Sequence, residues 1–330
     1  MSTFKALLAT QENGQFRATI QQISCDALPP GEVRVRVLYS SLNYKDGLTV
    51  SGRPGLIRKF PMIPGIDFAG TVEESSSPDF LPGDQVVLTG AGAGETIWGG
   101  YAELARWNAE FLTPLPKGMS LPQSMAIGTA GFTAMQCVMA LESHGLKPGG
   151  RPVVVTGAGG GVGSVAIAIL GKLGYHVVAS TGRPELGDYL RSLGATEIIG
   201  RNELSGTSGR PLDRERWDGA VDSVGGTTLA GILPSIVTNR AVALCGLAGG
   251  TAFTTTVMPF ILRGVSLLGI NSVNVTREER QQVWRRLSLD LPLDRLDAIT
   301  LIEPLERVFD LGKQILEGKI RGRTVIDVTA

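Results

Sequence analysis

The chain has 330 residues, enough for two domains with separate hydrophobic cores. Lysine plus arginine and aspartate plus glutamate each number 31, and this zero net charge argues against a surface that binds nucleic acid or anionic membranes. We find no apolar run long enough to span a bilayer. Cys25, Cys137 and Cys245 are sparse and lack metal-ligand spacing, and neither His144 nor His176 resembles a ligand. These features predict a cytoplasmic protein without zinc or any other metal.

The first part of the chain, as far as Pro122, contains short extended runs separated by turns. Pro29-Pro-Gly31 and Leu81-Pro-Gly-Asp84 are turn signals. This spacing indicates a compact β domain rather than a parallel sheet. The predicted strands are Phe4–Ala9, Glu32–Ser40, Ala69–Glu73, Gln85–Thr89 and Tyr101–Ala105.

The middle of the chain alternates strands with helices, which is typical of a doubly wound parallel sheet. Gly200–Arg216 is polar and irregular, and we interpret it as a surface loop with room for a short helix. The final segment contains two helical stretches and a strand, Arg323–Val328, and is predicted to return to the first domain. The predicted strands of the middle region are Pro152–Thr156, His176–Ser180, Glu197–Ile199, Ala220–Ser223, Ala241–Cys245 and Val265–Leu268.

A glycine-rich turn links the first of these strands to a predicted helix, Ser164–Leu173. Glycine lets the backbone turn tightly and approach a pyrophosphate closely. The backbone amides at the start of the following helix then attract the negative charge of the pyrophosphate. The usual dinucleotide spacing would place a third glycine at position 162, where this chain has valine; glycines three residues apart, at 157, 160 and 163, fit instead. Such turns also occur without a ligand. Strand, turn and helix in this order nevertheless favour a dinucleotide, bound by Gly160, Gly161, Val162 and Gly163.

The end of the second strand indicates which dinucleotide is bound. A carboxylate there would grip the ribose 2′-hydroxyl, but the chain has Ser180, Thr181 and Arg183. Hydroxyl groups and a guanidinium suit a 2′-phosphate. The alternative is an exposed arginine in an ordinary turn. We predict NADPH as the cofactor, with these three residues at the 2′-phosphate.

Several segments, in order along nearly the whole chain, resemble the medium-chain dehydrogenase/reductase superfamily, and within it the zinc-independent group of acryloyl-CoA reductases and putative quinone oxidoreductases. The zinc alcohol dehydrogenases of the superfamily have catalytic Cys and His ligands and a four-cysteine lobe that this chain lacks. The segments are Ser40-Ser-Leu-Asn-Tyr-Lys-Asp46, Phe60-Pro-Met-Ile-Pro-Gly-Ile-Asp-Phe-Ala-Gly70, Gly128-Thr-Ala-Gly-Phe-Thr-Ala134, Pro259-Phe-Ile-Leu-Arg-Gly264 as far as Gly269, and Gly322-Arg-Thr-Val325.

The resemblance implies an α/β protein with a GroES-like β domain and a Rossmann domain, a doubly wound parallel sheet that binds NADP. The domain boundaries we predict are residues 1–122 for the GroES-like catalytic domain, 123–268 for the Rossmann domain and 269–330 for the return to the catalytic domain. A homodimer is implied as well, with Thr254–Leu268 extending the Rossmann sheet across a two-fold axis.

Four polar residues of the first domain are the candidate catalytic group. Asn43, Tyr44 and Asp46 follow the Glu32–Ser40 strand, where a core-facing pattern would place apolar residues. Tyr44 is a candidate proton donor or hydrogen-bond donor to a thioester carbonyl. Alternatively, Asn43 and Asp46 only cap a turn beside Tyr44. Asp67 interrupts an apolar run and needs a partner if it is buried; a structural salt bridge is an equal alternative to a catalytic role.

The resemblance also implies further cofactor-binding residues. Thr129 and the stretch around Ser223 resemble the segments that line the nicotinamide half of the cleft, although a helix cap and a turn are the ordinary alternatives. Arg323 is a candidate to pair with Asp67 or to contact the cofactor. Residues after the later strands of the sheet complete the set, namely Cys245, Gly246, Leu247 and Asn271.

The activity implied is NADPH-dependent reduction of a short α,β-unsaturated acyl-CoA, acryloyl-CoA to propionyl-CoA, with hydride addition at the β-carbon. Such a reduction needs no metal if hydrogen-bond donors meet the enolate oxygen. One alternative is a reductase of quinones or enones, which would share every cofactor residue. Another is a catalytically idle NADPH-binding sensor. The predicted partners are therefore the acyl-CoA or quinone substrate and a second copy of the chain.

Overall fold

The structure, a computed structural model, describes residues 2–205 and 210–330. The chain forms two compact units. Unit 1 comprises Met1–Thr129, Ser272–Ser288 and Asp297–Ala330, and unit 2 comprises Ala130–Asn271 and Leu289–Leu296. The division at residues 122 and 268 stays a prediction.

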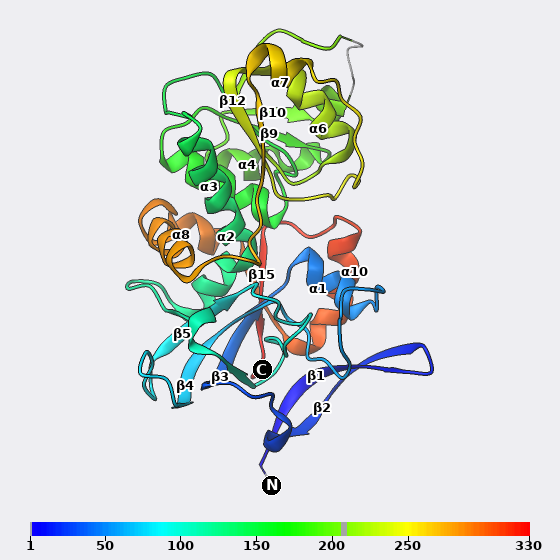
Figure 1. Ribbon diagram of the computed structural model, residues 1–330, viewed down its shortest axis with the longest axis vertical. Coiled ribbons are helices and arrows are strands. Elements are labelled where there is room, and N and C mark those ends of the chain that lie inside the picture. The colour runs from blue at the N-terminus through cyan, green and yellow to red at the C-terminus, as the bar shows by residue number, and fades with distance from the viewer. Residues whose placement is uncertain (1, 206–209) are drawn as a thin grey trace. The chain divides into compact units, whose positions relative to one another are not determined.

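Unit 1 is built around a sheet whose strand order, among the described residues, is β14-β15-β3-β4-β5-β7, with β6 pairing with β3. All its pairs are antiparallel except β14 with β15. Figure 1 shows β15, from the end of the chain, running alongside β3. The elements are β3 (Val33–Ser41), α1 (Tyr44–Val50), β4 (Asp67–Ser75), β5 (Gln85–Thr89), β6 (Leu104–Trp107), β7 (Thr113–Pro114), α8 (Arg277–Asp290), β14 (Thr300–Pro304), α10 (Val308–Leu316) and β15 (Arg323–Asp327).

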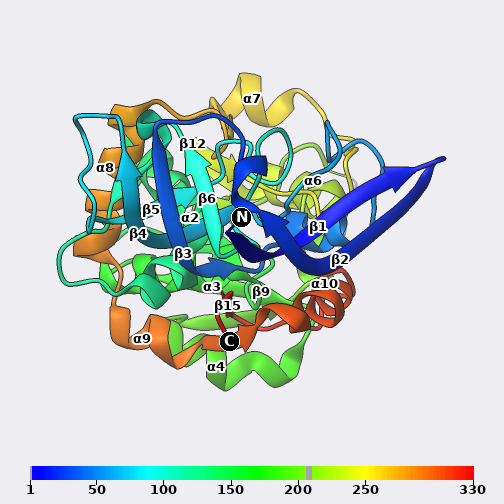
Figure 2. The ribbon, with the colours of Figure 1, turned by 90° about the horizontal axis from the view of Figure 1, so that it is seen from below.

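A two-stranded arm, β1 (Thr3–Glu12) with β2 (Gln15–Ser24), belongs to the same unit and projects from it in Figure 2. Its loop consists of Asn13 and Gly14, whose φ angles are 50° and 78°. Two consecutive positive φ angles define the type I′ turn that suits the twist of a tight hairpin. The predicted strand Phe4–Ala9 lies within β1, whereas no strand was predicted at β2, which is mostly polar and exposed.

Helix α1 is held against α10 by two glycines. A Cβ on Gly47 would lie 2.7 Å from the backbone oxygen of Gly312, and a Cβ on Gly312 would lie 2.7 Å from Val50. Only residues without side chains allow the helices to approach this closely. This packing fixes α1, whose first residue is Tyr44, against α10.

Unit 2 contains a parallel sheet with the strand order β10-β9-β8-β11-β12-β13 among the described residues. From β8 the chain adds β9 and β10 on one side, and it then returns to add β11, β12 and β13 on the other side, as in a doubly wound dinucleotide-binding fold. Right-handed crossovers then place α3 and α4 on one face and α6 and α7 on the other, and Figure 1 shows these pairs apart. The elements are β8 (Val153–Val155), α3 (Gly161–Lys172), β9 (Val177–Thr181), α4 (Gly187–Leu193), β10 (Glu197–Gly200), α5 (Asn202–Ser205), β11 (Trp217–Asp222), α6 (Gly226–Ile232), β12 (Ile236–Leu244), α7 (Met258–Arg263), β13 (Ser266–Gly269) and α9 (Leu293–Ala298), which begins in this unit.

The predicted fold class is confirmed, but several predicted bounds are wrong. Helix α3 begins at Gly161 rather than Ser164, and β6 begins at Leu104 rather than Tyr101. Strands β11 and β12 begin earlier than predicted, and β14 was not predicted. The predicted loop Gly200–Arg216 contains the short helix α5, while its residues 206–209 lie outside the described part of the chain.

Helix α2 (Leu121–Ser143) corrects the expectation that no apolar run is long enough to cross a membrane. Its length and its mean hydropathy of 1.3 meet that requirement, yet 83% of the apolar window is buried in the protein. A core helix of this length has the same composition as a membrane span. The helix is interrupted at Gly128, which has φ 50° and ψ −162°.

Candidate active site

The glycine-rich turn of unit 2 has no space for side chains. Gly157 has φ +58°, and a Cβ there would lie 2.3 Å from Oγ of Ser223. A Cβ on Gly163 would lie 2.5 Å from the carbonyl oxygen of Gly157. Gly160 is the N-cap of α3, so the amides of Gly161, Val162 and Gly163 form its first turn and lack acceptors within the helix. This tight cradle of unsatisfied amides fits the pyrophosphate of a dinucleotide.

Two arginines flank the turn after β9. Nη2 of Arg183 donates to the carbonyl oxygen of Gly159 at 3.2 Å, which holds this guanidinium over the glycine turn. The Arg201 guanidinium lies so close to Gly182 that a Cβ there would be 2.8 Å from its central carbon. The backbone N–H groups of Arg183 and Arg201 donate to the side-chain and backbone oxygens of Thr181, respectively. The sequence interpretation missed Arg201, which follows β10.

The other candidates in unit 2 follow the carboxyl ends of neighbouring strands and therefore share one edge of the sheet. Asp222, the last residue of β11, is buried and accepts hydrogen bonds from Thr156, Val224 and Gly225. Burial raises the pKa of this carboxyl, and the hydrogen bonds lower it by a smaller amount. The predicted residues at this edge are Ser180, Thr181, Ser223, Cys245, Gly246, Leu247 and Asn271.

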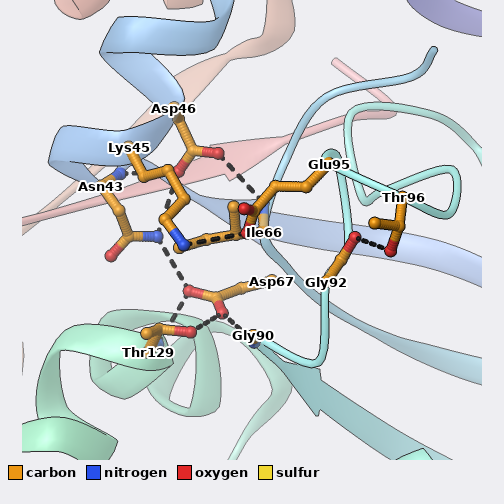
Figure 3. Close-up of polar contacts among 10 residues, drawn as sticks. All are labelled: Asn43, Lys45, Asp46, Ile66, Asp67, Gly90, Gly92, Glu95, Thr96 and Thr129. Atoms are coloured by element: carbon orange, nitrogen blue, oxygen red, sulfur yellow. Dashed lines mark hydrogen bonds and ion pairs between the residues drawn. The ribbon is translucent and has the colours of Figure 1, made fainter. Parts of the chain in front are cut away.

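In unit 1, the carboxylate of Asp67 is the centre of a buried polar cluster, shown in Figure 3. Its Oδ1 accepts a 2.5 Å hydrogen bond from the Thr129 hydroxyl and a 3.3 Å bond from the Gly90 N–H. Its Oδ2 accepts from the Ser41 hydroxyl at 2.5 Å, the Asn43 amide at 2.9 Å and the Thr129 N–H at 2.8 Å. Asp67 therefore orients the Thr129 hydroxyl, whose proton points into the cluster.

Asp46 is the second buried carboxyl of the cluster. Its Oδ2 accepts from the backbone N–H of Asn43 at 2.8 Å and from the Asn43 amide at 3.1 Å, and its Oδ1 accepts from Ile66 N–H at 3.0 Å. Burial, together with the nearby charge of Asp67, raises the pKa of Asp46 to about 7. Asn43 and Asp46 thus fix the start of α1, as the capping alternative predicted.

Tyr44 differs from the other predicted catalytic residues because it is exposed. It is the first residue of α1, and 41% of it is accessible, whereas Asn43, Asp46 and Asp67 are buried. The following residue, Lys45, forms a 2.8 Å ion pair with Glu95. The phenol of Tyr44 is therefore available to a ligand, while the other three side chains can act only through the groups they hold.

Arg323 joins this cluster from β15. Its guanidinium is buried and donates to the carbonyl oxygens of Ala126, Leu42 and Met125, and to Oδ1 of Asn43 at 3.3 Å. A Cβ on Gly128 would lie 2.6 Å from Oδ2 of Asp67 and 2.7 Å from Nη2 of Arg323, so both side chains border the same point. Arg323 and Asp67 are thus brought together around Gly128, and these contacts make Arg323 a scaffold of the cluster.

Among residues 2–205 and 210–330, no group of three or more His, Cys, Asp and Glu side chains is arranged to hold a metal ion. Unit 2 instead has a phosphate cradle with two arginines, and unit 1 has the exposed phenol of Tyr44 and the Thr129 hydroxyl held by Asp67. This arrangement suits a cofactor-dependent redox reaction with proton transfer.

Comparisons with known proteins agree with this arrangement. Residues 29–117 match the alcohol dehydrogenase GroES-like domain family, and residues 161–288 match the family described as zinc-binding dehydrogenase. The chain is 54% identical to acrylyl-CoA reductase AcuI of Ruegeria pomeroyi, over 99% of this chain and 100% of that protein. The chain belongs to the medium-chain dehydrogenase/reductase superfamily.

Two solved structures of the superfamily superpose on nearly the whole chain. The yhdH oxidoreductase from Salmonella enterica, in complex with NADP, has a TM-score of 0.95 and 48% identity, covering 98% of this chain and 99% of that one. The yhfP protein of Bacillus subtilis, with NAD bound, has a TM-score of 0.95 and 44% identity, covering 99% of this chain and 100% of that one. Membership of the predicted family is therefore confirmed.

Proposed function

We propose that the chain catalyses the NADPH-dependent reduction of acryloyl-CoA to propionyl-CoA. The observation that carries this proposal is the 54% identity, from end to end, to a protein named acrylyl-CoA reductase. The cradle and its two arginines support NADPH as the cofactor, because both guanidinium groups lie beside the strand end where a 2′-phosphate would bind.

In this proposal the two units supply different groups. The residues of unit 2 hold the cofactor, and Thr129 receives the nicotinamide carboxamide. NADPH, when bound, supplies a hydride for the β-carbon of the substrate. Tyr44 donates a hydrogen bond or a proton as charge develops on the thioester enolate, since it is the exposed hydroxyl beside the cluster. The proposed cofactor residues are Thr129, Gly160, Gly161, Val162, Gly163, Ser180, Thr181, Arg183, Arg201, Ser223, Cys245, Gly246, Leu247 and Asn271. Arg323 is assigned to the support of the Asp67 cluster instead, because its buried guanidinium donates to groups of that cluster.

The proposal is tested by steady-state NADPH oxidation with acryloyl-CoA, crotonyl-CoA and a simple quinone, with NADH in parallel. We expect the highest kcat/KM for acryloyl-CoA with NADPH. Turnover of the quinone without turnover of either acyl-CoA would make the chain a quinone reductase. Tight NADPH binding without turnover of any acceptor would favour a sensor.

Replacing Tyr44 with Phe tests its role directly. Loss of a general acid lowers kcat by about 100-fold or more, while affinity for NADPH should be retained. Tyr39→Phe is the control, because Tyr39 is a tyrosine of β3 and lies outside α1. Equal kcat values for Tyr44→Phe and the unaltered enzyme would assign the proton to solvent.

We also propose a cytoplasmic homodimer. The three cysteines are free thiols, which suits a reducing compartment. Val257, Ile261 and Leu262 on and beside α7 are 64%, 68% and 59% exposed, close in sequence to β13 at the edge of the unit 2 sheet. A second copy would cover these side chains and pair with the open edge of β13. Light scattering should give twice the monomer mass, and Ile261→Asp should lower it, while the exposed Leu289→Asp should not.

A further inference from the structure

Arg280 is a buried cation on α8, with 2% of its surface exposed. Its Nη1 donates to the carbonyl oxygen of Thr89 at 2.7 Å and to the Thr89 hydroxyl oxygen at 3.2 Å. Burying a guanidinium is costly unless its donors and its charge are compensated. Burial lowers the pKa of Arg280, and the negative charges of Asp67 and then Glu279 act in the opposite direction and partly compensate its charge. The charge of Arg280 therefore interacts with the carboxylate of Asp67 in the polar cluster, although the two residues are far apart in the sequence.

The connection runs through a single peptide group. The carbonyl oxygen gripped by Arg280 and the N–H of Gly90 belong to the same planar unit and point in opposite directions. That N–H donates to the carbonyl oxygen of Ile66 at 2.9 Å and to Oδ1 of Asp67 at 3.3 Å. Hydrogen bonds at both ends of a peptide polarise one another in a buried site. Arg280 thus fixes the direction in which the Gly90 N–H points.

The same carboxylate oxygen of Asp67 accepts the Thr129 hydroxyl. A Cβ on Gly90 would lie 3.1 Å from the carbonyl oxygen of Ser272 and 3.6 Å from Oγ1 of Thr129, so this peptide borders the hydroxyl directly. The φ of Gly90 is +65°, a conformation that favours glycine. A rotation of the peptide would therefore move both the N–H donated to Asp67 and the backbone packed beside Thr129.

We propose that Arg280 is a positioning residue for the reaction: by holding the Thr89–Gly90 peptide it aims an N–H at Asp67 and thereby fixes the Thr129 hydroxyl. The inference rests on the proposed function, in which Thr129 receives the nicotinamide. It assigns α8 a role in catalysis although Arg280 itself touches neither cofactor nor substrate.

The test compares Arg280→Lys and Arg280→Gln with Arg285→Lys and Arg285→Gln. Arg285 is exposed on the same helix and serves as the matched control. Lysine keeps the charge but loses the fork that reaches both oxygens of Thr89. The measurements are Tm, kcat and KM for acryloyl-CoA, and Kd for NADPH and for 2′,5′-ADP, which carries only the adenine half of the cofactor.

For Arg280→Lys we expect kcat to fall about tenfold and Kd for NADPH to rise about threefold. Kd for 2′,5′-ADP and KM for acryloyl-CoA should both stay within about twofold of the values for the unaltered enzyme. Arg280→Gln, if it folds, should lose more kcat than Arg280→Lys, which then acts as a partial rescue. A lower Tm with kcat and NADPH affinity equal to those of Arg285→Lys would show a merely structural role and overturn the proposal. Equal weakening of NADPH and 2′,5′-ADP would overturn it as well.

The unaltered enzyme separates this inference from the proposed function. If it does not reduce acryloyl-CoA, the proposed function fails, whereas the ratio of the NADPH and 2′,5′-ADP affinities still decides the role of Arg280. If it reduces acryloyl-CoA and Arg280→Lys is indistinguishable from Arg285→Lys, only the role of Arg280 fails.

Discussion

Asp46 and Asp67 share one amide group. The side-chain nitrogen of Asn43 lies 3.1 Å from Oδ2 of Asp46 and 2.9 Å from Oδ2 of Asp67, so a neutral donor bridges two buried carboxyl groups. Two carboxylates at close range disfavour one another's ionised form, and burial adds to the effect. Burial and the charge of Asp67 raise the pKa of Asp46 to about 7.

This raised pKa predicts a pH dependence of stability. Because the folded-state pKa of Asp46 is about 7 and its ordinary value is 3.8, the folded protein holds more protons than the unfolded chain between these values. The stability contribution of Asp46 is therefore complete below pH 3.8 and is lost as pH rises through 7. The loss is on the order of 4 kcal/mol.

The check is the free energy of urea unfolding of the unaltered chain minus that of Asp46→Asn, measured from pH 4 to pH 8. This difference should fall as pH rises, because asparagine does not titrate. The exposed Asp84→Asn is the control and should show no such fall. A difference that is flat or rises with pH would contradict the assignment.

Asp67→Asn should cost both stability and activity. The amide nitrogen of asparagine would replace one of the two carboxylate oxygens. In the place of Oδ2 it would face donors from Ser41, Asn43 and Thr129, and in the place of Oδ1 it would face donors from Thr129 and Gly90. Leaving buried donors unmatched costs about 2–4 kcal/mol. Thermal unfolding and kcat with acryloyl-CoA are the measurements, and a variant equal to the unaltered protein in both would remove Asp67 from the site.

Arg183→Gln and Arg201→Gln should each weaken NADPH binding about tenfold while leaving NADH binding unchanged, because a charge-assisted contact to the 2′-phosphate is worth about 1.5 kcal/mol. Fluorescence titration with both cofactors measures this. Arg191→Gln, on the exposed surface of α4, is the control. Equal weakening of NADPH and NADH by Arg201→Gln would mean that Arg201 supports the turn after β9 rather than the phosphate.

Gly163→Ala should weaken binding of both cofactors and lower Tm, because its Cβ would meet the backbone oxygen of Gly157 at 2.5 Å. Gly200→Ala is the matched control, since the nearest atom to its Cβ is a side-chain oxygen of Glu203 at 3.8 Å. Calorimetry and NADPH titration test the prediction. Retention of full affinity would show that the turn relaxes at little cost.

The Rossmann part was predictable from local patterns because its strands are short and apolar and alternate with helices, which is typical of a doubly wound sheet. Strand β1 was predicted as Phe4–Ala9, but β2 was not, although Asn13-Gly14 is a hairpin signal, because β2 presents mostly polar side chains. Helix α1 was predicted only as a turn.

The polar residues of the site were identifiable as isolated anomalies, but their connections were not. The contact of Asp67 with Thr129 spans 62 positions and that of Arg323 with Asn43 spans 280, distances over which no sequence period operates. Arg201 was missed because its proximity to Gly182 depends on the pairing of β9 with β10 rather than on the fingerprint turn. Arg280 was missed because its contact with Thr89 spans 191 positions of the sequence.

The position of β15 has a consequence for synthesis of the protein. Residues 323–327 form a strand between β14 and β3, and Arg323 reaches the Asn43 side chain. Most of unit 2, residues 130–271, is contiguous and has emerged before that strand is translated. On the ribosome, the end of β3 at residues 39–41 therefore keeps an open edge until residues 323–327 are made, and this edge needs protection from pairing with other nascent chains.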